Sequence, residues 1–167
     1  VFRPFNNTWY TRLASTGALS AFQFGAAGDK PVVGDFDGDG RGDIAVFRPS
    51  ESNWYIIKSN LGFFIQTWGA TGDIPVPAGF DGDGSTDLAV FRPISVPDAA
   101  DYFVLRSSDS TLRTASWGSP GDIPLSGDTD GDQKTDFVVY RPSNNTWYGL
   151  TAANRQFTEQ FGTTNDQ

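Results

Sequence analysis

The sequence predicts an all-β protein, a β-propeller of four-stranded blades, with about four blades in its 167 residues. Three observations predict this class. Short motifs recur about every 45 residues, and short apolar runs alternate with Gly/Asp-rich turns. No segment shows the 3.6-residue period of an amphipathic helix. A four-stranded unit of about 45 residues, covered by neighbours on both faces, is typical of a propeller blade.

Four motifs mark the repeat, always in the same order. Aromatic-Arg-Pro triplets begin at Phe2, Phe47, Phe91 and Tyr140, and an aromatic pair follows each triplet. Aromatic-Gly pairs begin at Phe24, Trp68, Trp117 and Phe161. Gly-Asp-x-Pro turns begin at Gly28, Gly72 and Gly121. We therefore divide the chain into a partial blade at 1–27 and blades at 28–71, 72–120 and 121–167.

Each full unit is expected to hold four strands. In the second unit these are Pro31–Val33, Ile44–Phe47, a strand from Trp54, and Phe63–Trp68. The second strand is apolar at consecutive positions, which is expected of a strand covered on both faces. With three strands in the partial blade, the chain should hold fifteen. An arc of about four blades exposes two faces, so we expect further blades of the same protein or other copies of this chain to complete a ring.

The charge balance favours cations as partners. The chain has 20 acidic and 12 basic residues and a net charge of -8, which disfavours nucleic acid and anionic membrane surfaces. It has no Cys and no His, which removes disulfides, thiol catalysis, the usual zinc ligand and the usual general base. No apolar run approaches the roughly 20 residues of a membrane span, so membrane insertion is not expected.

Three loops between the first and second strands concentrate the acidic residues. The pattern is Asp-x-Asp-Gly-Asp-x-x-x-Asp, in which carboxylates at positions 1, 3, 5 and 9 and the carbonyl at position 7 can surround a cation. The first loop offers Asp35, Asp37, Asp39, Arg41 and Asp43. The middle loop has Gly79 at position 1 and offers Asp81, Asp83, Ser85 and Asp87. The third loop offers Asp128, Asp130, Asp132, Lys134 and Asp136.

Hard oxygen ligands in flexible loops favour Ca²⁺, so we predict about three ions, one per loop, with the Gly79 loop the weakest site. The loops differ from an EF-hand because position 12 is Val46, Val90 or Val139, where an EF-hand has a bidentate Glu. We therefore expect modest affinity, suited to extracellular calcium. The alternative is that these are solvated Asp/Gly turns without metal.

The motifs resemble those of the FG-GAP/VCBS repeat family of calcium-binding β-propellers, which is related to the propeller of integrin α subunits. The resemblance covers essentially the whole chain. It is carried by the aromatic-Gly pairs, by Gly-Asp-x-Pro in place of the family's Gly-Ala-Pro, and by Asp-x-Asp-Gly-Asp before an apolar strand. It implies calcium in the loop between the first two strands of each blade. It also implies a secreted or cell-surface location and a scaffold or adhesion role.

Two other sets of residues recur once per blade. Arg of the Arg-Pro motif and Asp of the Gly-Asp turn are expected to pair structurally, although the same residues can clamp a carboxylate substrate. Trp9, Trp54 and Trp147 share one slot, and Trp68 and Trp117 another. Repeated aromatics fill the space between blades more often than they stack on sugars. A four-residue insertion at Ile94–Asp101 is the best single place for a partner contact.

The leading hypothesis is a non-enzymatic calcium-binding module with a structural, adhesion or protein-interaction role and a protein or glycan as ligand. A calcium-dependent lectin is the alternative. A polysaccharide-acting enzyme ranks third, because two carboxylates suffice for glycoside hydrolysis. The repeated carboxylates of this chain are expected to be committed to metal, so no catalytic residue is assigned.

Overall fold

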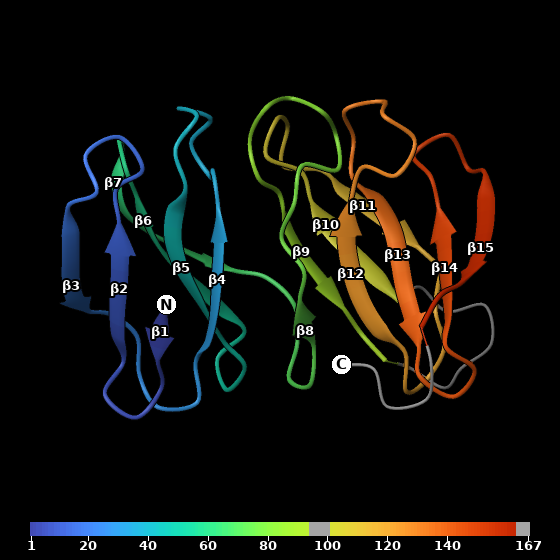
Figure 1. The fold of residues 1–167 in the computed structure, drawn as a ribbon, viewed down its shortest axis with the longest axis horizontal. Helices are drawn as coiled ribbons and strands as arrows, with labels where there is room; N and C mark the ends of the chain where they lie inside the picture. The colour runs from blue at the N-terminus through green and yellow to red at the C-terminus, as the bar shows by residue number, and fades with distance from the viewer. Residues whose placement is uncertain (94–100, 163–167) are drawn as a thin grey trace.

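A computed structural model describes residues 1–93 and 101–162, and in these ranges every regular element is a β-strand. The fifteen strands form four antiparallel sheets, one for each repeat, arranged as an open arc (Figure 1). The predicted all-β class and the strand count are confirmed. Within the described residues, no helix is long and apolar enough to cross a membrane. Of the predicted insertion at Ile94–Asp101, residues 94–100 lie outside the described residues.

Each sheet is a meander, in which strands consecutive in the chain are hydrogen-bonded neighbours. The first sheet contains β1 (Phe2–Arg3), β2 (Thr8–Arg12) and β3 (Leu19–Gln23). The second contains β4 (Lys30–Gly34), β5 (Asp43–Arg48), β6 (Asn53–Lys58) and β7 (Gly62–Thr67). The third contains β8 (Ile74–Pro75), β9 (Leu88–Phe91), β10 (Tyr102–Leu105) and β11 (Leu112–Ala115). The fourth contains β12 (Ile123–Gly127), β13 (Asp136–Arg141), β14 (Thr146–Leu150) and β15 (Gln156–Gln160).

The second strand of each full blade is the most deeply buried element. On β5, Ala45, Val46 and Phe47 are all fully buried, and all four residues of β9 are buried. Consecutive side chains on a strand point to opposite faces, so burial of all of them requires cover on both sides. Neighbouring blades supply this cover, as the unbroken apolar runs predict.

The core consists of two clusters that lie between blades. One joins the second and third sheets, with Phe47, Trp54 and Ile56 packed against Val90 and its neighbours. The other joins the third and fourth sheets, with Phe91 and Tyr102 meeting Phe137 and Val139. Tyr102 also donates its hydroxyl hydrogen to the Val138 carbonyl at 2.7 Å. Apolar burial that spans two sheets makes each blade depend on its neighbour for stability.

The tryptophans take part in this blade-to-blade packing. Trp54 Nε1 donates to the Trp68 carbonyl at 3.1 Å within its blade. Trp68 Nε1 donates to the Phe103 carbonyl of the next blade at 3.3 Å, and Trp117 Nε1 donates to the Tyr148 carbonyl of the following one at 3.2 Å. An indole N–H that already donates to a backbone carbonyl in the interior has a structural role. The prediction that repeated aromatics fill the space between blades is confirmed for these residues.

Three of the aromatic-Gly pairs place their glycine, Gly25, Gly69 or Gly118, where an added side chain would crowd its neighbours. Gly69 has φ +99°, and a Cβ there would lie 3.1 Å from Val90 Cγ1 and 3.2 Å from Asp73 Oδ2. We predict that Gly69→Ala lowers the free energy of unfolding by roughly 1–3 kcal/mol through backbone strain. Urea unfolding followed by Trp fluorescence measures this. Gly127→Ala is the matched control, because no atom lies within 4 Å of its Cβ position. Equal effects of the two substitutions would contradict the steric explanation.

Candidate metal centre

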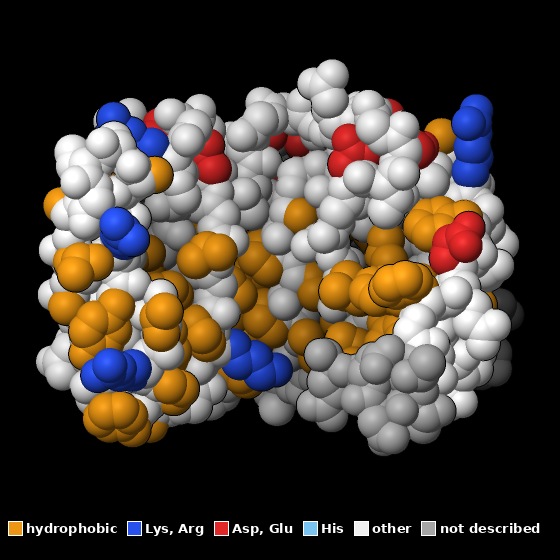
Figure 2. All heavy atoms as spheres, in the orientation of Figure 1, with side chains coloured by type: hydrophobic (Ala, Val, Ile, Leu, Met, Phe, Trp, Pro, Cys, Tyr) orange, Lys and Arg blue, Asp and Glu red, His pale blue; other side chains and the backbone are white. Residues whose placement is uncertain are grey.

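The three Asp loops lie along one edge of the arc, the upper edge in Figure 1, where β4, β8 and β12 pass into β5, β9 and β13. Most acidic side chains on the face shown in Figure 2 gather toward this edge, whereas hydrophobic side chains reach the surface farther from it. In each loop the first strand ends before the acidic run, and the second strand begins near its last Asp. The antiparallel pairing of the two strands therefore closes each loop on itself.

The first loop brings three of its predicted ligands together. Oxygens of Asp35, Asp37 and Asp39 lie within 4.8 Å of one another. Asp35 Oδ1 accepts hydrogen bonds from the N–H groups of Gly38 at 2.7 Å and Asp39 at 3.1 Å, and its Oδ2 accepts one from Gly40 at 2.8 Å. Burial raises the pKa of the Asp35 carboxyl, but these N–H donors outweigh it and hold the pKa below its usual value. The loop thus keeps the Asp35 carboxylate charged and oriented.

Asp37 carries an oxygen without a partner. Its Oδ2 accepts a hydrogen bond from the Asn60 N–H at 3.1 Å, but its Oδ1 is buried and has no hydrogen-bond donor. An unsatisfied buried carboxylate oxygen costs free energy comparable to a lost charged hydrogen bond. Beside two further carboxylates, a cation is the chemical group that would satisfy it. This oxygen is the best local indication that the loop is built around an ion.

The third loop also gathers three carboxylates, in a different combination. Oxygens of Asp128, Asp130 and Asp136 lie within 4.8 Å of one another. Asp128 accepts hydrogen bonds from the N–H groups of Gly131 at 2.7 Å and Gln133 at 2.9 Å. The Gln133 N–H is the main cause of a lowered pKa at Asp128. Asp132 lies outside this group, and its Oδ1 accepts a hydrogen bond from the Lys134 N–H at 2.9 Å.

The Asp at position 9 of every loop has a structural role that the motif did not predict. Asp43 is 2% exposed. Its Oδ2 accepts a hydrogen bond from the Phe36 N–H at 2.8 Å, and its Oδ1 accepts one from the Ser59 N–H at 2.6 Å. Asp87 and Asp136 make the equivalent pair of bonds. Each of these carboxylates links the start of its loop to the turn between the third and fourth strands of the blade. Asp43 is not part of the group formed by Asp35, Asp37 and Asp39.

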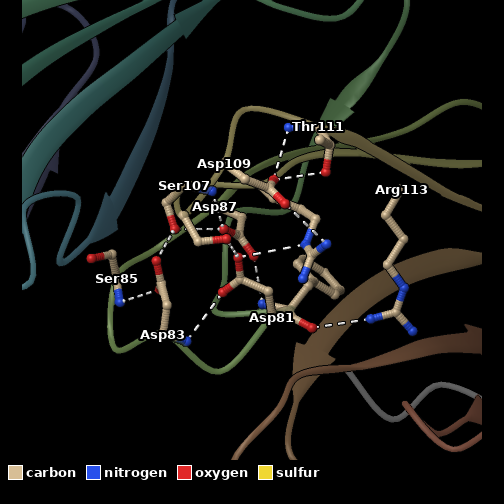
Figure 3. A network of polar contacts seen from close by, with 11 residues as sticks. Asp81, Asp83, Ser85, Asp87, Ser107, Asp109, Thr111 and Arg113 are labelled. Carbon is tan, nitrogen blue, oxygen red and sulfur yellow. Dashed lines mark hydrogen bonds and ion pairs between the residues drawn. The ribbon is translucent and has the colours of Figure 1, made fainter.

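The middle loop is arranged differently, and Figure 3 shows its polar contacts. In the described part of the chain, no group of three carboxylates gathers here. Asp81 Oδ2 accepts a hydrogen bond from Ser108 Oγ at 2.6 Å and lies 3.6 Å from Arg106 Nε. Ser107 Oγ lies 2.9 Å from Asp83 Oδ2 and 2.8 Å from Asp87 Oδ1. Burial raises the pKa of the Asp87 carboxyl despite these donors. Protein groups thus occupy the carboxylate oxygens that a metal needs.

The position-7 residues lie next to the carboxylates of their own loops. The N–H groups of Arg41 and Ser85 donate to Asp39 Oδ1 and Asp83 Oδ1 at 2.9 and 2.8 Å. The Ser85 carbonyl oxygen faces position 1, because a Cβ built on Gly79 would lie 3.3 Å from it. An Asp at position 1 would therefore approach the position-7 carbonyl, as the predicted ligand set requires.

Hydrogen bonds link each loop to the loop of the next blade, and sequence reasoning missed this. The Thr86 N–H donates to the Asp35 carbonyl at 2.6 Å, and the Asp35 N–H donates to Thr86 Oγ1 at 2.9 Å. The Thr135 N–H donates to the Gly79 carbonyl at 2.9 Å in the same way. Thr at position 8 of two loops was the available signal. Position 1 of one loop is therefore fixed partly by the next blade.

The recurring Arg and Asp form ion pairs in the three full blades, as expected of a structural role. Arg48 Nε lies 2.8 Å from Asp29 Oδ1 and Arg48 Nη2 lies 3.0 Å from Asp29 Oδ2, with the Asp29 side chain fully buried. The other two pairs are Arg92–Asp73 and Arg141–Asp122. Each guanidinium also covers an aromatic ring, as Arg48 covers Tyr55 at 4.3 Å. These arginines bind aspartates of their own blades, so their guanidinium groups are not free to clamp a carboxylate substrate.

Comparison with known proteins supports the assignment drawn from the motifs. Searches of curated proteins and of solved structures gave no match. The family model described as the FG-GAP repeat matches residues 27–62. The matched segment contains the Gly-Asp-x-Pro turn, the first Asp loop with Asp35, Asp37 and Asp39, and strands β4 to β6. The predicted resemblance is confirmed at the level of the FG-GAP family, and the chain carries an FG-GAP repeat at residues 27–62.

Proposed function

We propose that this protein is a non-catalytic, calcium-stabilised interaction module of the propeller type that works in an extracellular setting. The observation that carries the calcium proposal is the buried Asp37 Oδ1, which has no donor and lies in a cluster with Asp35 and Asp39. Ca²⁺ takes six to eight oxygen ligands and tolerates irregular geometry, so it suits short loops of carboxylates and carbonyls.

Two loops supply the residues that would hold the ions. In the first these are Asp35, Asp37 and Asp39, with the carbonyl of Arg41 as a further candidate. In the third they are Asp128, Asp130 and Asp136, with the carbonyl of Lys134. A bound cation would neutralise carboxylates that otherwise repel one another at short range. The mechanism that follows is structural, because Asp35 also bonds the next blade through Thr86.

The setting and the role follow from the chemistry and the family. The loops lack the bidentate Glu that gives EF-hands tight binding, so millimolar extracellular calcium suits them best. The FG-GAP match supports a propeller-type module with an adhesion or protein-interaction role. The lectin alternative needs exposed aromatic platforms, but of the three tryptophans that share one slot Trp9 and Trp54 are 5% and 0% exposed, and Trp147 is half-buried. Interaction with a protein is therefore the role that we propose.

Isothermal titration with CaCl₂ after EDTA treatment and dialysis tests the calcium proposal. We expect about two ions per chain, because two loops gather three carboxylates each. Asp37→Asn should remove one ion from the stoichiometry. Asp109→Asn is the matched control, since Asp109 is a carboxylate outside both clusters. Absence of binding at several millimolar calcium, or equal loss with both variants, would refute the proposed function.

A further inference from the structure

The middle loop differs from the other two in the cation beside it, and an inference that rests on the proposed calcium function follows from this difference. Arg106 follows β10, and its Nε lies 3.6 Å from Oδ2 of Asp81, whose side chain is only 2% exposed. In the part of the chain that the structure describes, Asp81 is the only aspartate of the three loops that takes part in an ion pair. The middle loop thus already has a cation supplied by the protein.

Position 3 of the loops shows the difference atom by atom. In the first loop, Asp37 Oδ1 is buried and has no hydrogen-bond donor. In the middle loop, both oxygens of the equivalent Asp81 have partners. Its Oδ1 accepts a hydrogen bond from the Asp83 N–H at 3.1 Å. Its Oδ2 accepts one from Ser108 Oγ at 2.6 Å and lies beside Arg106. The oxygen that indicates an ion in the first loop therefore has no counterpart in the middle loop.

The buried atoms that lack a hydrogen-bond partner differ in charge between the two loops. Within the described residues, these side-chain atoms are Asp37 Oδ1 and Arg106 Nε. A cation satisfies the first, which is an acceptor on a carboxylate. A cation is repelled by the second, which is a donor on a guanidinium. The contact of Arg106 with Asp81 at 3.6 Å is an ion pair rather than a hydrogen bond. The local charges therefore favour a divalent ion in the first loop and oppose one in the middle loop.

Arg106 also contacts Asp109, and this second contact orients the guanidinium. Arg106 Nη1 lies 3.4 Å from Asp109 Oδ2, in the turn between β10 and β11. Asp109 Oδ1 in turn accepts hydrogen bonds from the Thr111 N–H at 2.9 Å and from Thr111 Oγ1 at 2.7 Å, and Figure 3 shows Asp81 and Asp109 in the same network. The Asp109 side chain is 47% exposed, so water screens this pair more than the pair with the buried Asp81. One guanidinium can serve both carboxylates because it has five N–H donors.

A second arginine lies near the middle loop but makes a different kind of contact. Arg113, on β11, donates from Nη1 to the Phe80 carbonyl at 3.0 Å. Its guanidinium carbon lies 4.9 Å from the centre of the Phe137 ring. Arg113 thus supports the backbone at the start of the loop and packs on a ring of the next blade. The cation that pairs with a carboxylate of the loop is Arg106.

The repeat allows the position of Arg106 to be compared between blades. The residue just before the N–H that binds the position-9 Asp is Lys58 in the second blade, Arg106 in the third and Thr151 in the fourth. Lys58 Nζ lies 4.6 Å from the centre of the Phe64 ring, away from any loop ion pair. Thr151 Oγ1 accepts a hydrogen bond from the Arg155 N–H at 3.3 Å. The paired cation is therefore found in the blade whose loop has glycine at position 1.

We propose that the Arg106 guanidinium is the built-in cation of the middle loop, which keeps its shape without calcium and binds none. The positive charge lies beside Asp81, and the loop has three carboxylates where each of the others has four. Fewer carboxylates and a fixed positive charge both weaken the attraction for a divalent ion. Arg106 is thus a positioning residue for the loop. The expectation of a weak third calcium site is replaced by an expectation of no site in this loop.

Conversion of the middle loop into a metal site tests the proposal. In titration calorimetry with CaCl₂, the double variant Gly79→Asp/Arg106→Thr should bind one ion more than the wild type, because it restores the carboxylate and removes the cation. Gly79→Asp alone should gain no ion. Gly79→Asp/Asp109→Asn is the matched control and should also gain none, since it leaves Arg106 beside Asp81. Lys58→Thr makes the equivalent change in the second blade and should leave the stoichiometry unchanged.

Hydrogen exchange followed by NMR gives a readout that needs no added metal site. In the wild type, EDTA should accelerate exchange at the N–H groups of Gly38 and Gly40, which donate to a carboxylate of the first loop. EDTA should not accelerate exchange at the N–H groups of Asp83 and Ser85 in the middle loop. Arg106→Thr should accelerate exchange at these two groups by about fivefold, with or without EDTA, because an ion pair is lost.

The outcomes separate this proposal from the proposed function. A wild type that binds no calcium refutes the proposed function, and the exchange rates of Arg106→Thr still decide whether Arg106 holds the loop. A wild type that binds three ions, or a double variant that gains none, refutes the role of Arg106 and leaves calcium binding in the other loops intact. Exchange in the middle loop that responds to EDTA, or that does not respond to Arg106→Thr, also refutes the role of Arg106.

Discussion

Calcium removal is expected to lower the free energy of unfolding by about 5 kcal/mol. Each site occupied at a hundredfold excess over its dissociation constant contributes roughly 2.7 kcal/mol by mass action, and two loops gather the carboxylates. For a chain of this length the corresponding fall in melting temperature is roughly 10–20 °C. Differential scanning calorimetry in saturating calcium and in EDTA measures it.

Two controls separate calcium binding from charge screening. Mg²⁺ at the same ionic strength should restore little of the stability, because it demands small octahedral sites and keeps its waters. The double variant Asp37→Asn/Asp130→Asn should melt at nearly the same temperature with and without EDTA. A wild-type melting temperature that EDTA leaves unchanged would show that the loops hold no stabilising ion.

Asp43→Ala is expected to lower the free energy of unfolding by about 3 kcal/mol even in EDTA. The substitution leaves the N–H groups of Phe36 and Ser59 without their acceptor, and each unsatisfied buried group costs roughly 1–3 kcal/mol. Urea unfolding in the absence of calcium isolates this structural role from metal binding. Asp43→Asn keeps one carbonyl oxygen and should lose about half as much.

Asp39→Ala is the matched control for Asp43→Ala. Asp39 belongs to the same loop but is exposed, and its removal relieves repulsion with Asp35 and Asp37 when no ion is bound. In EDTA we expect this substitution to be nearly neutral. If Asp43→Ala and Asp39→Ala lower the free energy of unfolding equally without calcium, the hydrogen bonds of Asp43 do not stabilise the loop as proposed.

The dependence of each blade on its neighbour connects these predictions. Asp35 belongs to a carboxylate cluster and also exchanges hydrogen bonds with Thr86 of the next blade. Calcium in the first loop would therefore stabilise the contact between two blades as well as the loop. We expect a chain depleted of calcium to lose order first around this contact between the second and third blades.

The strands could be predicted from the sequence because their signal is local. The expected second strand, Ile44–Phe47, lies within the observed Asp43–Arg48, and the expected Phe63–Trp68 differs from the observed Gly62–Thr67 by one residue at each end. Unbroken apolar runs between Gly/Asp turns depend only on neighbouring residues. Repetition then identifies the blade, since four copies of one pattern require one structure.

Which aspartates have a structural role and which are available to bind an ion was decided only by the tertiary structure. Asp37 and Asp43 are chemically identical in the motif, but one carries an unpartnered oxygen and the other accepts two backbone hydrogen bonds. The donor to Asp43 Oδ1 is the N–H of Ser59, in the turn between β6 and β7. Arg106 likewise reaches Asp81 from the end of β10. Sequence alone thus determined the blades and where carboxylates concentrate, whereas contacts between distant segments decided which carboxylates are free to hold an ion, because a side chain's partners depend on how the chain folds.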